Sequence, residues 1–166
     1  MGLPQQEQPP SQPSTSTSTS TSTDHKDLNP SATQLPPEAI TLATKLFDLA
    51  RQGSTAPLHQ YITAGIPVNL TNHKGDTLLM LAAYHGNLST VTMLLEAGAD
   101  TNVLNERGQS PIAGAVFKGY FEVVEALWKG GADVGAGQPN AVDAARMFRR
   151  GDMLGLFGIE EGEGGS

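Results

Sequence analysis

The sequence predicts an all-α solenoid of about four helix-turn-helix units, of which the outer two are caps. Three observations lead to this prediction: an internal repeat of about 33 residues, capping residues at matching places in the copies, and apolar residues at helical spacing. Sliding the chain until Gly75 lies on Gly108 superposes 73–105 on 106–138 with eight identical residues. A weaker copy precedes them, so the predicted units are 38–72, 73–105, 106–138 and 139–158.

The two ends of the chain differ in composition from the repeats. Residues 1–34 are predicted to be a disordered tail, because Gln, Pro, Ser and Thr dominate them and few large aliphatic side chains are available to bury. Residues 35–158 form the predicted repeat domain. Residues 159–166 are predicted to be an acidic, Gly-rich tail.

The net charge of −7 lies mostly outside the repeats, because residues 38–159 hold eleven acids and nine bases. A weakly acidic body disfavours nucleic acid and acidic membranes as partners. The apolar run 78–84 is too short to span a bilayer, and the first residues lack the pattern of a signal peptide. Without cysteine there is no thiolate chemistry. We expect a monomer without cofactors in the cytoplasm, with the nucleus as an alternative.

The first unit is expected to open at Pro36-Pro37-Glu38 and to turn Phe47, Leu49 and Ala50 inward. A proline at the start of a helix suits the position where no backbone donor is needed. Because this unit is the first of the array, we expect it to be the N-terminal cap.

The central units each begin with a hydroxyl side chain that suits a helix N-cap, Thr77 in one and Ser110 in the next. Pro111 fits the first helical position, and Gly86 or Gly119 ends the first helix. Asn87 is expected to act as a cap. The polar stretch 99–109 suits a hairpin-like loop to the next unit.

The second helix of each central unit carries apolar residues at the spacing of one buried stripe. The predicted stripe is Val91, Leu94 and Leu95 in one unit and Val124, Leu127 and Trp128 in the next. The last unit is shorter and holds Gly155 inside its final helical stretch, so we expect it to be the least stable.

These residues resemble the ankyrin repeat family, whose repeat of about 33 residues has a Thr-Pro-Leu-His-x-Ala signature and a Gly-Ala-Asp turn. The signature corresponds here to Thr77–Ala82 and to Ser110–Ala115, with Met80 and Ala113 in place of the histidine. The resemblance implies a non-catalytic module or adaptor that binds a protein partner through the loops and first helices.

A narrower resemblance is to small stand-alone ankyrin proteins, and residues 75–86, 116–119 and 139–148 carry it. Some bacterial relatives in that group are associated with catalase or haem handling. The alternative function is therefore an accessory factor for a haem enzyme, in which His73 or His85 would contact the cofactor.

The chain shows no arrangement typical of catalysis or metal binding. His25, His59, His73 and His85 lack the short spacing of metal ligands. Glu122 and Glu125 fit a solvated helix face better than an acid–base pair. Three arginines at 146, 149 and 150 are too few to indicate nucleic-acid binding.

The surface that stacking leaves free is the predicted binding site. Tyr84 and Phe117 occupy equivalent places in two units, and rings surrounded by mixed charge are typical of a protein-binding hot spot. The alternative is that both rings only shield their own repeats. The predicted partner-binding residues are His73, Lys74, Asp76, Tyr84, His85, Glu106, Arg107, Gln109, Phe117 and Lys118.

Overall fold

A computed structural model describes residues 36–162. The predicted tail 1–34 lies outside these residues, as does 163–166 of the predicted acidic tail. The described part contains eight helices and one isolated bridge between Thr71 and Thr77 but no strand, which confirms the all-α class. The helices are α1 (Pro37–Gln52), α2 (Thr55–Thr63), α3 (Leu78–Tyr84), α4 (Leu88–Glu96), α5 (Pro111–Lys118), α6 (Phe121–Lys129), α7 (Ala141–Met147) and α8 (Gly151–Leu156).

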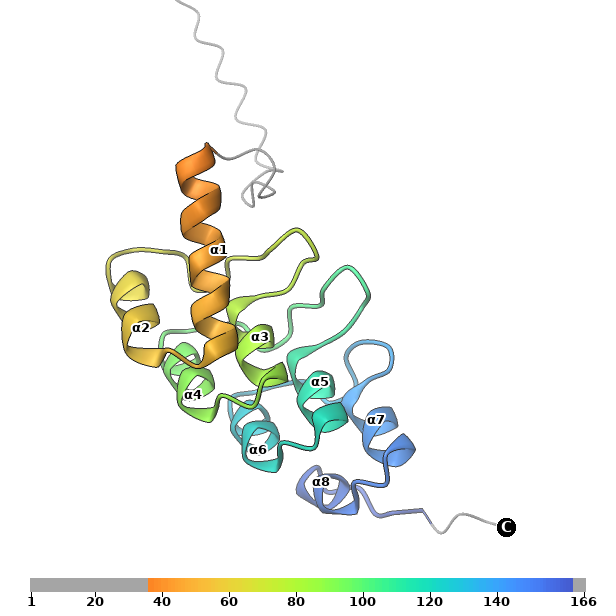
Figure 1. Cartoon of the computed structure of the whole chain (residues 1–166). Helices are drawn as coiled ribbons and strands as arrows, with labels where there is room; N and C mark the ends of the chain where they lie inside the picture. Colours follow the sequence, from red (N-terminus) through yellow and green to blue (C-terminus); the bar gives the residue numbers. More distant parts are fainter. Residues whose placement is uncertain (1–35, 163–166) are drawn as a thin grey trace, which may run out of the picture.

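The helices form four antiparallel pairs that stack into two rows (Figure 1). The first helices α1, α3, α5 and α7 pack in one row, and the second helices α2, α4, α6 and α8 pack in the other. The loops before α3, α5 and α7 project to the same side of the array. None of the helices between residues 36 and 162 is long and apolar enough to cross a bilayer.

The predicted N-caps are confirmed by their hydrogen bonds. The Met80 amide donates to Thr77 Oγ1 over 3.1 Å, and the Ala113 amide donates to Ser110 Oγ over 3.2 Å. Each bond satisfies one of the free donors at the start of a helix. In the last pair Asn140 has the same role, and its Oδ1 accepts from the Asp143 amide over 2.8 Å.

Glycines after the first helices allow neighbouring pairs to approach closely. Gly86 has φ +73°, and a Cβ there would lie 3.0 Å from the Tyr120 ring. Gly53 is approached equally closely, because a Cβ there would lie 2.7 Å from Asn87 Oδ1. Asn87 occupies the N-cap position of α4, in agreement with the expectation that it acts as a cap, but its side chain makes no capping bond to that helix. Its Nδ2 instead donates to the Ala50 and Arg51 carbonyls at the end of α1, each over 2.9 Å. Asn87 thereby ties the second pair to the first.

The core lies between the two rows and is rich in Leu, Val and Ala. Phe47 and Ala50 are buried and Leu49 is half-buried, in agreement with the predicted inward face of α1. The predicted burial of Trp128 is wrong, because 39% of this residue is exposed. Trp128 lies in the last turn of α6, and the next helix in that row, α8, has six residues against the nine of α6.

Candidate partner-binding groove

A groove of about 740 Å³ opens between the loops and the row of first helices. Side chains of α3, α5 and α7 form its floor, and the loops before α3 and α5 form one edge. The lining residues are Arg51, Asn72, His73, Lys74, Asp76, Met80, Leu81, Tyr84, His85, Asn105, Arg107, Gln109, Ser110, Ala113, Gly114, Phe117, Pro139, Ala144, Met147 and Phe148.

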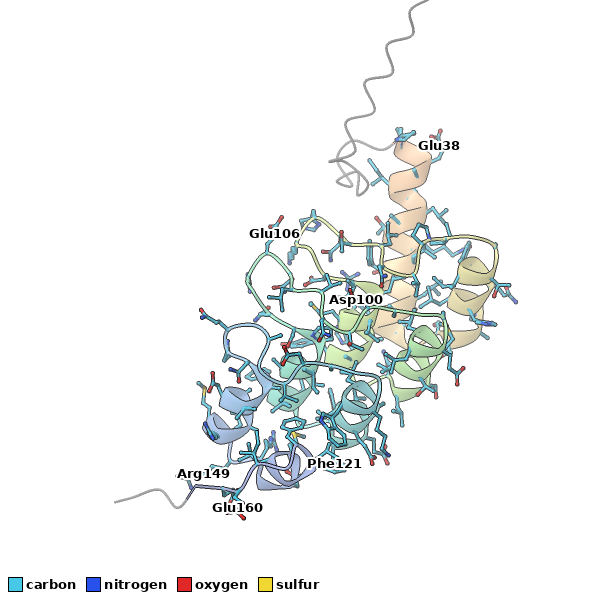
Figure 2. The ribbon with its side chains drawn as sticks, turned by 180° about the vertical axis from the view of Figure 1, so that it is seen from behind. Glu38, Asp100, Glu106, Phe121, Arg149 and Glu160 are labelled. Carbon is cyan, nitrogen blue, oxygen red and sulfur yellow. The ribbon has the colours of Figure 1, made fainter. Side chains whose placement is uncertain are left out.

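Most of the predicted site residues line this groove. The eight that do are His73, Lys74, Asp76, Tyr84, His85, Arg107, Gln109 and Phe117. Glu106 does not: it lies at the outer end of its loop (Figure 2), where its amide donates to the Lys74 carbonyl over 3.0 Å. Lys118 lies beside the groove, with Nζ 5.2 Å from the centre of the Tyr84 ring.

Apolar side chains at one register position form a row across three helices. Tyr84, Phe117 and Met147 are each the seventh residue after an N-cap, so they lie side by side on α3, α5 and α7. Their exposed fractions are 41%, 46% and 65%. Phe148 extends the row, and its ring packs edge-on against Phe117 with centres 5.0 Å apart.

Gly114 lies beneath the Tyr84 ring in the groove. A Cβ at Gly114 would be 3.4 Å from Tyr84 Cδ2, which is close to van der Waals contact, so the ring lies directly over this position of α5. The glycine weakens helix propensity by about 1 kcal/mol relative to alanine. Gly114 therefore contributes a bare backbone to the groove lining at a cost to the helix.

Asp76 lines the groove, but its carboxylate is hydrogen-bonded within the loops. Oδ1 accepts from Asn105 Nδ2 over 2.9 Å, and Oδ2 accepts from Asn72 Nδ2 over 3.3 Å. The same two asparagines fold their own loops, because each Oδ1 accepts two backbone amides. Asp76 thus joins two adjacent loops that carry His73, Lys74 and Arg107.

The loop edge is built as one connected layer. The Glu106 amide bonds to the Lys74 carbonyl, and the Gln138 amide bonds to the Gly108 carbonyl over 2.9 Å. Gly75 sits so close to the next loop that a Cβ would lie 3.0 Å from the Glu106 amide nitrogen. The edge that presents the polar groove residues is therefore fixed by backbone contacts.

The histidines of the groove do not form a metal site. His73 lies in the loop before α3, and His85 follows α3 with its ring edge-on to Tyr84 at 5.7 Å. Within residues 36–162 no three His, Asp or Glu side chains lie close enough together to hold a metal ion.

Among the exposed apolar residues that line the groove, Met147 and Phe148 are the two that the sequence did not predict. The N-cap of the last pair, Asn140, stands closer to Ser110 than Ser110 stands to Thr77, so a search at the regular period misaligns the last pair. Asn140 followed by an apolar stretch was the available signal, because Asn is a preferred N-cap.

Comparison with known proteins identifies the repeats. A family model for ankyrin repeats in three copies matches residues 46–138, which is more than half of the chain. The chain belongs to the ankyrin repeat family. A segment of 49 residues is 59% identical to part of a putative ankyrin repeat protein of Pseudomonas aeruginosa. The matched segment covers 30% of this chain and 29% of that protein.

Ankyrin repeats are generally modules for protein–protein interaction, and the family is typically non-catalytic. This ankyrin array departs from the family signature at Met80 and Ala113, where the signature has histidine. The hydroxyls of Thr77 and Ser110 still cap their helices without it. The departure leaves a thioether and a methyl group on the groove floor in place of two imidazoles.

Proposed function

We propose that this ankyrin protein is a non-catalytic interaction module that binds a protein partner in the groove. The observation that carries the proposal is the gathering of exposed apolar side chains. Seven large hydrophobic residues are exposed among residues 36–162, and Tyr84, Phe117, Met147 and Phe148 all line this one groove. Aromatic rings supply much of the binding energy of protein interfaces, because they bury a large area with little loss of rotamer freedom.

The test is capture of partners from a cell lysate, followed by calorimetry on the captured partner. Tyr84→Ala combined with Phe117→Ala should weaken binding by at least about 2 kcal/mol, the range of aromatic anchors. Both rings are well exposed, so their loss should change the stability of the fold much less.

The control pair is Glu122→Ala with Glu125→Ala on the opposite row. Glu125 forms an exposed ion pair with Lys129 at 2.7 Å, and such pairs contribute little. This variant should bind within about 0.5 kcal/mol of the parent. If the ring variant melts far lower than the parent, the rings have a structural role. If both variants bind like the parent, the partner uses another surface.

A further inference from the structure

The charge of the groove is opposite in sign to that of the whole chain. Three bases, Arg51, Lys74 and Arg107, line the groove against the single acid Asp76, in a protein whose net charge is −7. Both carboxylate oxygens of Asp76 already accept hydrogen bonds from asparagines. Lys118 adds a fourth cation beside the Tyr84 ring.

The bases have different surroundings. Lys74 and Arg107 are exposed and lie on two adjacent loops that backbone hydrogen bonds hold together. Arg51 lies at the end of α1, where its Nη1 pairs with the exposed Asp48 over 2.8 Å. Lys74 and Arg107 are therefore the cations that a ligand in the groove meets first.

Groove residues at equivalent positions of the four first helices form a line that crosses these helices. Arg51 stands two residues before Gly53, as Tyr84 stands before Gly86 and Phe117 before Gly119. Arg51, Tyr84, Phe117 and Met147 thus form one line across α1, α3, α5 and α7. Packed helices lie about 8 to 10 Å apart, so this line has the length of roughly eight extended residues.

We propose that the occupant of the groove is an acidic peptide segment of the partner, which lies across the first helices. Its apolar side chains contact Tyr84, Phe117 and Met147, and its carboxylates face Lys74, Arg107 and, toward α1, Arg51. This inference rests on the proposed function and adds the chemistry of the partner. Charge complementarity supports it, because a groove with excess positive charge on an acidic protein attracts negative segments selectively.

The test uses a phage-displayed library of random twelve-residue peptides, selected on the full chain. The enriched peptides should be net negative and carry aromatic or branched aliphatic residues. The best peptide, synthesised with a fluorophore, should lose affinity by about tenfold or more for Lys74→Glu with Arg107→Glu, measured by fluorescence anisotropy. Its affinity should also fall several-fold as NaCl rises from about 50 to about 300 mM.

The control is Lys129→Glu, a single charge reversal on the opposite row, which should change the affinity by less than about twofold. Circular dichroism melts of all variants should show that they remain folded. A peptide that still binds the control but not the Lys74/Arg107 variant supports the proposal.

The failures of the two proposals are distinguishable. Enriched peptides that are neutral or basic, and that lose binding with Tyr84→Ala and Phe117→Ala, would overturn the acidic occupant and leave the groove as the binding site. Peptides whose binding survives loss of both rings would overturn both proposals. Failure to enrich any peptide, or enrichment of sequences that match this chain's own ends, would also overturn the acidic segment of a partner.

Discussion

The two central repeats and the last repeat line the same groove, but the second helix of the last repeat is shorter than those of the central repeats. In the central repeats α4 and α6 have nine residues each, whereas α8 has six. The first helix of the last pair is not shortened in the same way: α7 has seven residues, as α3 has. The last repeat is therefore shortened in the row of second helices, whereas its first helix, which faces the groove, keeps its length.

The turn between the helices shows the same difference. Gly53, Gly86 and Gly119 take up the left-handed conformation after the first helices, and Arg149 takes this position in the last repeat with φ +53°. Residues with a Cβ are disfavoured in the left-handed conformation. The central turns are thus built for close packing, whereas the last turn tolerates strain at the end of the array.

The largest expected effect is that of adding one methyl group at a central turn. Gly86→Ala should destabilise the protein by about 2 to 4 kcal/mol, because the new Cβ meets the Tyr120 ring at 3.0 Å and the backbone has positive φ. Urea denaturation measures it. The matched change is Gly155→Ala in α8, where nothing lies within 4 Å of the new Cβ. This control should raise stability by about 0.5 to 1 kcal/mol, and equal losses for both would contradict the tighter packing of the central repeats.

A smaller effect of opposite sign is expected at the last turn. Arg149→Gly should stabilise the protein by about 0.5 to 1 kcal/mol, because glycine adopts positive φ without the cost that a Cβ brings. The same denaturation experiment measures the change. A loss of stability would mean that the Arg149 side chain makes contacts that outweigh the strain.

The last and central repeats should also differ in how often their helices open locally, which can be measured on the unmodified protein. Amides in 150–157 should exchange with solvent faster than those in 88–97, because a short end unit has few neighbours to hold it closed. Hydrogen exchange followed by mass spectrometry or NMR measures it. Equal protection of the two segments would show that the last repeat is as stable as the central ones.

The smallest effect is expected from the N-terminal segment. Deletion of residues 1–34 should change the melting temperature by no more than about 2 °C, because few apolar side chains are removed with it. Differential scanning calorimetry of the two chains gives the value. A large decrease would show that this segment packs on the array.

Local signals in the sequence were sufficient to predict the helical pairs. Capping hydroxyls, Pro111 and the glycines act within a few residues of where they stand, so Thr77 and Ser110 were assigned correctly. Interactions between repeats were not predictable in this way. Asn87 bonds to carbonyls 36 and 37 residues away, and Asp76 accepts from an asparagine 29 residues away.

The groove was predicted where the repeat is regular and missed where it is not. Tyr84 and Phe117 are one regular period apart, so the period placed them together. Met147 occupies the same register after a shortened repeat, and the period did not reveal it. The exposure of Trp128 depends on what the neighbouring pair places beside it, which the spacing of apolar residues in α6 does not contain.

The most direct test of the groove uses the methionines as internal probes. The chain has five, of which Met80 and Met147 line the groove, whereas Met93 and Met153 are buried elsewhere in the core. Methyl NMR spectra of the ¹³C-methionine-labelled full chain, recorded while the captured partner is added, follow all of them at once. We predict that the methyl signals of Met80 and Met147 shift or broaden while those of Met93 and Met153 stay in place. Unchanged signals of Met80 and Met147 at saturation would contradict binding in the groove.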